Sequence, residues 1–356
     1  MSQGMSIAVL YLVLQCGLVV FVYPQSIIQS QDSGHWVVVL LGWLLQGVML
    51  RLIVGGLREE KGDLLTRFNK AGIWIRLLLL WPLLFGNLLA LAVIVGGHSK
   101  VFGMLYLPDT PQWILSALLL VASISISYAE RDSLLRLASL IALFGAPLIM
   151  MSFGSMAKYM NYHLVFPIQP SFGFMREVSS LPLLFNFTNV VGLVGFMGPM
   201  SANAKRWLWG AWVLSLLFFF SIAYLPLSVF GQEVADNLRF PLITALDTAT
   251  VNWFFFDRIS MFYIMAMLLS TLINVSALLW LTRKLCSGSS TVRKLIGSPI
   301  TMAVLSLFFV SLIPNVESVE HMMRWIGPVR CGVLCMVAVF GAYCRSLLKQ
   351  ERQPHA

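Results

Sequence analysis

Ten segments of this chain are long and apolar enough to cross the hydrocarbon core of a bilayer, which takes about 20 helical residues. Only 11% of the residues are charged, whereas soluble domains carry about 25%. Too few polar side chains remain to cover a water-facing surface. The sequence therefore predicts an all-α integral membrane protein. The predicted spans are residues 6–24, 36–56, 73–97, 112–128, 134–156, 181–202, 206–230, 253–282, 297–315 and 324–347.

No hydrophilic stretch is long enough to fold separately, so we expect a single transmembrane domain over residues 1–356. The start of the chain lacks a basic n-region and a cleavage site, which favours a retained first span over a signal peptide. The two halves of the chain, about 6–156 and 181–347, contain five predicted spans each. These halves are candidates for two structural repeats.

The basic residues predict the orientation of the spans. Of the 24 lysines and arginines, 17 fall on one predicted side and 7 on the other. The seven are Lys100, Lys158, Arg176, Arg239, Arg258, Arg324 and Arg330. Short cytoplasmic loops are the richer in Lys and Arg, so both termini are predicted to face the cytoplasm. This topology accounts for the net charge of +9, and nucleic acid is not predicted as a partner.

Two spans have polar or flexible residues near their centres. Span 6 carries Asn186, Thr188 and Asn189, followed by Gly192, and span 1 carries Gln15 and Gly17. Paired interruptions in corresponding helices of two repeats indicate a transporter-type central site. Unwound backbone there could hold the carboxylate and ammonium of a small ligand. The sequence therefore predicts interrupted helices 1 and 6.

Other spans could line the same cavity. Span 3 contributes Asn87, and span 8 contributes Ser270, Thr271 and Asn274. Small and polar residues also let membrane helices pack closely and bond to one another. Helix packing therefore stays open as the alternative for every one of these positions. The predicted ligand-binding set is Gln15, Gly17, Asn87, Asn186, Thr188, Asn189, Gly192, Ser270 and Asn274.

Several chemistries lack sequence support. The chain has no Walker loop, nucleophile elbow or metal-ligand cluster, so we predict no enzyme activity, no metal and no cofactor. No carboxylate falls at the centre of a predicted span, and His98 and His163 are predicted to lie in outer loops. Proton-driven transport therefore has weak support. The outer segment 231–252 has a helical period interrupted by Pro241 and predicts a short amphipathic helix.

Local motifs in a shared order resemble those of a known family. Gly17 precedes Pro24 at the end of span 1, and "LPDTPQW" at 107–113 precedes span 4. Arg136 begins span 5, and Pro241 lies in the last long outer loop. On these residues the chain resembles the endospore germination permease family, the B subunits of nutrient germinant receptors. That family is related to the amino acid–polyamine–organocation transporters. The family's second glycine of span 1 and its glutamate of span 6 are replaced here by Val19 and Gly192.

The resemblance implies ten transmembrane helices in a five-plus-five inverted repeat, located in the inner membrane of a dormant spore. It implies a small nutrient, typically an amino acid, bound between spans 1, 3, 6 and 8. It also implies two partners, an A-type membrane subunit and a C-type lipoprotein. Two alternatives stay open. One is a secondary transporter of amino acids or organic cations, and the other is a scaffold that binds no ligand.

Overall fold

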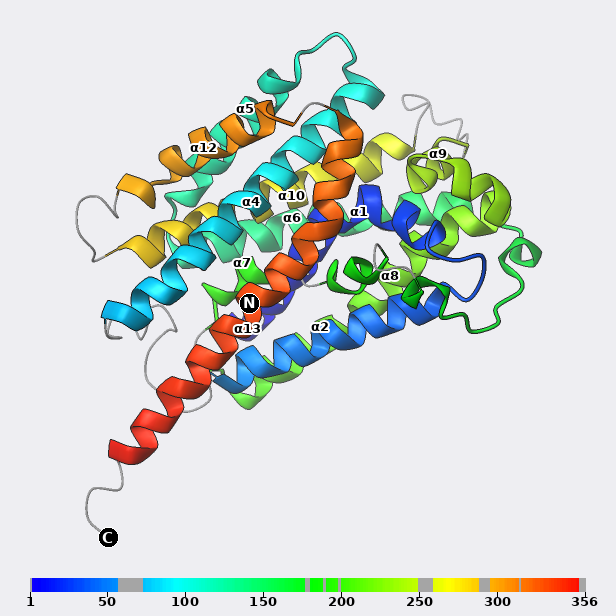
Figure 1. The fold of residues 1–356 in the computed structure, drawn as a ribbon. Helices are drawn as coiled ribbons and strands as arrows, with labels where there is room; N and C mark the ends of the chain where they lie inside the picture. Colours follow the sequence, from blue (N-terminus) through cyan, green and yellow to red (C-terminus); the bar gives the residue numbers. More distant parts are fainter. Residues whose placement is uncertain are drawn as a thin grey trace.

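The computed structural model describes residues 2–56, 73–176, 180–187, 190–197, 200–248, 259–287, 295–313 and 315–351. These residues form helices that pack side by side (Figure 1). The first half contains α1 (Gln3–Ile28), α2 (Trp36–Gly56), α4 (Ile73–Tyr106), α5 (Gln112–Ser127) and α6 (Arg131–Met156). The second half contains α8 (Ala202–Asn237), α9 (Pro241–Thr248), α10 (Ser260–Cys286), α12 (Pro299–Ser311) and α13 (Val316–Glu351).

Four short helical turns connect the two halves. They are the 3-10 helices η1 (Tyr162–Val165), η2 (Gly173–Met175) and η3 (Leu181–Phe185), and the four-residue α7 (Val191–Val194). Within the described residues, six helices are long and apolar enough to span a membrane, and three shorter apolar helices accompany them. Nine of the ten predicted spans overlap these helices, whereas predicted span 181–202 is not a single helix. The protein is an integral membrane protein.

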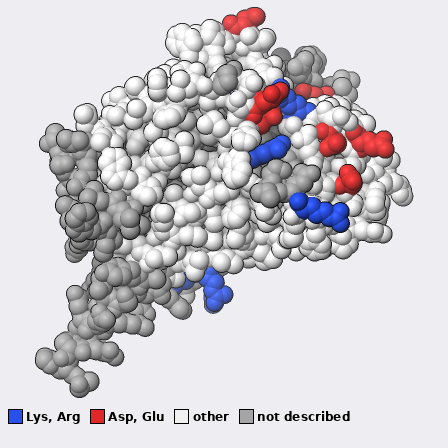
Figure 2. All heavy atoms as spheres, viewed as in Figure 1, with Lys and Arg blue, Asp and Glu red and all other residues white. Residues whose placement is uncertain are grey.

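Large apolar side chains are exposed on the outer helices, as expected of a surface that faces lipid. Leu118 on α5, Leu143 on α6, Leu217 on α8 and Val339 on α13 are each more than 60% exposed. On the face drawn in Figure 2, the described charged side chains gather towards the end of the molecule where Figure 1 places α9. This distribution fits an apolar belt with a polar end.

Two helices run through the middle of the bundle. Tyr11 and Leu14 of α1 and Ile273 and Ala277 of α10 are fully buried. α1 packs against α6, α8 and α10, and most of its described side chains between Ile7 and Gly17 are buried. Any polar atom on these two helices must therefore find a partner inside the bundle.

α2 and α8 are joined by a pair of indole rings. Trp43 and Trp212 stack with their ring centroids 3.7 Å apart. Trp43 Nε1 donates to the Trp212 carbonyl at 2.9 Å, and Trp212 Nε1 donates to the Trp43 carbonyl at 3.3 Å. Two hydrogen bonds and one stacking contact thus fix the two helices against each other.

The predicted interruption of helix 6 is confirmed, and that of helix 1 is wrong. Span 6 contains the two short helices η3 and α7 instead of one continuous helix, and the described residues between them, 186, 187 and 190, form turns. α1 is continuous from Gln3 to Ile28, through Gln15 and Gly17. Glycine weakens a helix by only about 1 kcal/mol relative to alanine. At Gly17 the absent side chain allows α10 to approach closely, so the glycine serves packing and the helix continues.

Three basic or histidine residues lie deeper than predicted. α4 extends to Tyr106, which places His98 and Lys100 inside the helix and not in an outer loop. α13 begins at Val316, so Arg330 lies 14 residues into the helix, about 21 Å from its start. All three side chains are at most 8% exposed. The helices continue through these polar residues because their side chains are buried against other helices of the bundle.

The outer segment after α8 contains the predicted short helix. α8 bends at Gly231, whose φ of 74° favours glycine, and continues to Asn237. α9 then begins at Pro241, so the proline starts this helix and does not interrupt it. Proline suits the first turn because its missing N–H would have no helical partner there.

Candidate functional site

Gly17 of α1 faces two polar residues of α10. A Cβ added at Gly17 would lie 3.3 Å from Asn274 Nδ2 and 3.4 Å from Thr271 Cα. Asn274 is 1% exposed, and its Nδ2 has no hydrogen-bond partner among the described residues. A buried donor left without an acceptor costs about 1–3 kcal/mol. This amide is therefore available to a ligand or a water molecule.

His98 of α4 completes the group from the third side. Its Nε2 lies 2.7 Å from Thr271 Oγ1, and its Nδ1 lies 2.9 Å from the carbonyl of Ile94. The carbonyl can only accept, so Nδ1 carries the proton in the neutral ring. Nε2 then accepts from the Thr271 hydroxyl. Gly17, His98, Thr271 and Asn274 together form what we call the central polar cluster.

The Thr271 hydroxyl has more acceptors within reach than it has hydrogens. Besides His98, it lies 3.0 Å from the Gly17 carbonyl and 2.9 Å from the Met267 carbonyl. One O–H can donate to only one of them at a time. The bond it makes therefore depends on the protonation of His98. If both ring nitrogens of His98 carried a proton, Nε2 would donate to Thr271 Oγ1. The Thr271 hydroxyl would then donate to the Gly17 carbonyl.

The broken span 6 lies one helical turn from this cluster. A Cβ at Gly192 would lie 3.5 Å from Ala277, three residues after Asn274, and 3.7 Å from Leu14, three residues before Gly17. The short helix α7 thus packs where α1 and α10 meet. Residues of α1, α4 and α10 thus meet at the central polar cluster, and α7 lies one turn away from it.

The predicted site residues divide into those the fold gathers and those it separates. Gly17, Gly192 and Asn274 lie in or beside the central polar cluster. Ser270 is the next turn along α10, but its hydroxyl donates to the Ala266 carbonyl of the same helix. Thr188 and Asn189 lie outside the described residues.

Gln15 lies on the opposite side of α1 from Gly17, because two residues correspond to about 200° of helical rotation. It shares a face with Tyr11, whose hydroxyl donates to Gln46 at 2.8 Å. Both polar atoms of the Gln15 amide are buried without a partner among the described residues. Gln15 therefore contributes to a separate polar position towards α2 and α8.

The other two asparagines contact helices away from the cluster. Asn87 Nδ2 donates to Thr282 Oγ1 at 3.2 Å, eleven residues along α10 from Thr271. Asn186 lies against α13, since a Cβ at Gly327 would come 2.9 Å from its Oδ1. Asn87 thus joins α4 to α10, as the packing alternative suggested.

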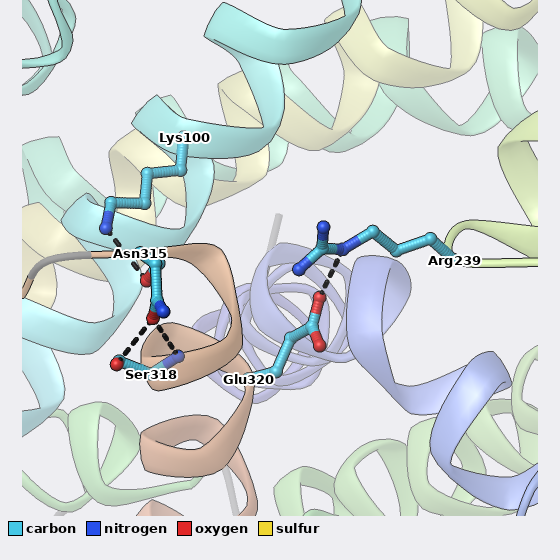
Figure 3. Close-up of polar contacts among 5 residues, drawn as sticks. All are labelled: Lys100, Arg239, Asn315, Ser318 and Glu320. Atoms are coloured by element: carbon cyan, nitrogen blue, oxygen red, sulfur yellow. Dashed lines mark hydrogen bonds and ion pairs between the residues drawn. The ribbon is translucent and has the colours of Figure 1, made fainter.

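The C-terminal part of α4 and the start of α13 form a second polar group (Figure 3). Lys100 Nζ donates to the carbonyls of Ile313 and Asn315, both at 2.9 Å, where α12 ends. Asn315 Oδ1 accepts from the backbone N–H of Ser318 at 2.9 Å and so caps the start of α13. Arg239 pairs with Glu320 at 2.8 Å. Every group here has a partner, which indicates a structural role.

A cavity of about 760 Å³ opens at the other end of the bundle. It lies between the first turns of α1 and the start of α6. Gln3, Ser6, Arg131, Asp132, Leu135, Arg136 and Ser139 line it. Arg131 also donates to the carbonyl of Phe196, just after α7. The cavity therefore borders the C-terminal part of the broken span, after α7.

Fold and site together define a transporter-like membrane protein. The structure is similar to that of a Na⁺-coupled sialic acid symporter in a substrate-bound, outward-open state, with a TM-score of 0.66. The similarity covers 87% of this chain and 74% of that chain, at 13% sequence identity. A comparison with curated protein sequences gives no match.

The chain belongs to the spore germination protein family, whose model matches residues 3–321. The resemblance found in the sequence is thereby confirmed. Sequence reasoning missed His98 and Arg330 as interior residues. The signal for His98 was present in "GGHSK", because the apolar period of α4 resumes at Val101 and Phe102.

Proposed function

We propose that this protein is the nutrient-sensing subunit of a germinant receptor in the spore membrane. It binds a small nutrient, an amino acid, in a closed central site and passes a conformational change to its partners. Those partners are an A-type membrane subunit and a C-type lipoprotein. Both termini face the cytoplasm, and the chain is a five-plus-five inverted repeat.

The observation that supports this proposal most is the central polar cluster beside the broken span 6. Asn274 Nδ2 is a donor without a partner among the described residues, and the Thr271 hydroxyl has three possible acceptors. Both groups lie near α7 of the broken span 6. Buried polar groups in a membrane protein are expensive and mark functional sites. The spore germination family gives this site its biological context.

Signalling in this scheme is a population shift between two arrangements of the bundle. A nutrient biases the receptor only if it binds one arrangement more tightly than the other. Span 6 forms two short helical segments, η3 and α7, instead of one continuous helix, which suits this span to differ between the two arrangements.

The test is a gene deletion in spores, preferably in a strain lacking other nutrient receptors. Germination is followed against the twenty L-amino acids, glucose and inosine, with the gene restored as control. Loss of the response to one nutrient class, and its return on restoration, supports the receptor. Survival of every response in that strain contradicts it.

A secondary transporter is the second candidate, favoured by the similarity to a Na⁺-coupled symporter and by the buried position of His98. Concentrative uptake of an amino acid by vesicles, driven by a sodium or proton gradient, would support transport. Binding without uptake would favour the sensor.

A further inference from the structure

Three sulfur-containing side chains meet where α13 packs against α2. Cys335 Sγ of α13 lies 3.8 Å from Met49 Sδ of α2, although the two residues are 286 positions apart in the sequence. Cys331 lies one helical turn before Cys335, and the two cysteine side chains interact. Residues i and i+4 of a helix share one face, with their Cβ atoms about 5–6 Å apart. We call Met49, Cys331 and Cys335 the three-sulfur group.

The spacing within the three-sulfur group suits a metal ion. Metal–sulfur bonds are about 2.3 Å long, so three sulfur ligands in a plane around one ion are about 4 Å from one another. The 3.8 Å between Met49 Sδ and Cys335 Sγ matches that separation. Both cysteines are free thiols. An ion placed between the three sulfurs therefore requires little movement of α2 or α13.

The chemistry of the ligand atoms decides which metal fits. Two thiols and a thioether are soft ligands, and soft ligands select Cu⁺. A structural Zn²⁺ site takes four ligands from cysteine, histidine and carboxylate side chains. Among the described residues, no three side chains of those kinds gather at one place. The three-sulfur group is therefore suited to Cu⁺ and not to Zn²⁺.

Charge also favours a monovalent ion. Two thiolates and one Cu⁺ have a net charge of −1, which is costly among apolar side chains unless a positive group is close. Arg330 directly precedes Cys331, and its side chain is 3% exposed. Its Nη2 has no hydrogen-bond partner among the described residues. The guanidinium offsets the charge of a Cu⁺ complex, whereas a divalent ion would leave the region with a net positive charge.

The depth of the three-sulfur group brings it close to one surface of the membrane. Met49 lies six residues before Gly55, where its apolar span ends, and Cys335 lies five residues before Phe340, where the span of α13 ends. At 1.5 Å per residue these distances are about 8–9 Å along each helix. In the predicted topology both ends face the cytoplasm, where thiols stay reduced. Cys335 is only half-buried, which gives an ion access to the site.

We propose that Met49, Cys331 and Cys335 bind one Cu⁺ ion, which joins α13 to α2. On binding, the two thiols release their protons to water and the copper keeps its +1 state. Since Trp43 and Trp212 already join α2 to α8, the ion extends that connection to a third helix. The sequence pattern did not indicate this site, because Met49 is far from both cysteines along the chain.

The first experiment measures Cu⁺ binding by the purified full-length protein in detergent. Under exclusion of oxygen, Cu⁺ is supplied as its coloured bicinchoninate complex, and the protein competes with this chelator. We expect one Cu⁺ per chain and, by X-ray absorption, sulfur ligands at about 2.3 Å. Failure to take up one equivalent, or a shell of nitrogen and oxygen ligands, would overturn the inference.

The second experiment removes the thiols one at a time. We expect Cys331→Ser and Cys335→Ser each to lose the ion, because each lacks one of the two anionic ligands. Cys286→Ser is the matched control, since it removes a buried thiol from α10, and it should bind Cu⁺ like the wild type. If either serine variant does not accumulate, the alanine variant replaces it. Wild-type affinity in both α13 variants would place the ligands elsewhere and overturn the site.

The third experiment tests the thioether. We expect Met49→Leu to lower the affinity about tenfold, because it removes the one neutral ligand. Met336→Leu is the control, since that methionine follows Cys335 but is 44% exposed. Cu⁺ should also raise the melting temperature of the wild type and leave that of Cys335→Ser unchanged. Equal affinities of Met49→Leu and the wild type would overturn the connection between α13 and α2.

Discussion

His98 Nε2 lies 2.7 Å from Thr271 Oγ1, which joins α4 to α10 directly beside Gly17. The antiparallel packing of these two helices repeats at Asn87 and Thr282, eleven residues away on each helix. The two hydrogen bonds hold the same pair of helices, and the first also lies beside Gly17 of α1. A ligand bound at the central polar cluster would therefore affect the packing of α4 through the first bond.

Removing the Thr271 hydroxyl should weaken this junction. Thr271→Val keeps the shape but leaves His98 Nε2 without its donor, so we expect a loss of about 1–3 kcal/mol. Ser270→Ala is the control, because that hydroxyl contacts only its own helix. Thermal unfolding in detergent compares the two. Equal melting temperatures would mean that Thr271 contributes no more than Ser270.

Gly17 should not tolerate a large side chain. Gly17→Leu would force α1 away from Thr271 and Asn274, and overpacking of this kind costs about 1–3 kcal/mol. We expect membrane insertion to persist and the nutrient response to be lost. Gly210→Leu is the control, since nothing lies within 4 Å of a Cβ there. A dose–response curve for Gly17→Leu that matches the wild type would remove Gly17 from the site.

Asn315 should matter more for stability than the ion pair drawn beside it in Figure 3. Asn315→Ala removes the cap of α13 and should cost about 1 kcal/mol. Glu320→Gln breaks the pair with Arg239, which is 38% exposed, and should cost well under 1 kcal/mol. The melting temperatures of the two variants compare the helix cap with the ion pair. A larger decrease for Glu320→Gln than for Asn315→Ala would contradict this prediction.

His35 should make stability depend on pH. It lies just before α2, and burial lowers the pKa of its imidazole below 6.5, although Asp32 and Asp236 oppose that shift. The unfolded chain therefore takes up a proton first as the pH falls, and stability decreases below about pH 6.5. His35→Gln should flatten the melting temperature between pH 7.5 and 5.5. His163→Gln, in an exposed turn, should leave the slope unchanged.

The sequence predicted most of the helices because hydropathy depends on the chain alone. It also predicted a break in span 6, and η3 ends at Phe185, just before Asn186, whose amide competes for backbone hydrogen bonds. It could not predict that Gly17 and Gly192 both lie inside helices, because that depends on what packs opposite each glycine. His98 and Lys100 were placed beyond the end of span 3 for the same reason, and Arg330, although within the predicted span 324–347, was counted with the outer side. Polarity indicates the end of a span only when no neighbouring helix shields the polar group.

The stacked indoles of Trp43 and Trp212 have a mechanical consequence. A ring stack and two reciprocal hydrogen bonds join α2 to α8. We therefore expect these two helices to keep their relative position when other helices move. Rings this close also couple their electronic transitions. Because the chain has 11 tryptophans, the signal of this pair is the difference between the circular dichroism of the wild type and of Trp43→Phe, and we expect that difference to stay constant while a nutrient displaces other helices.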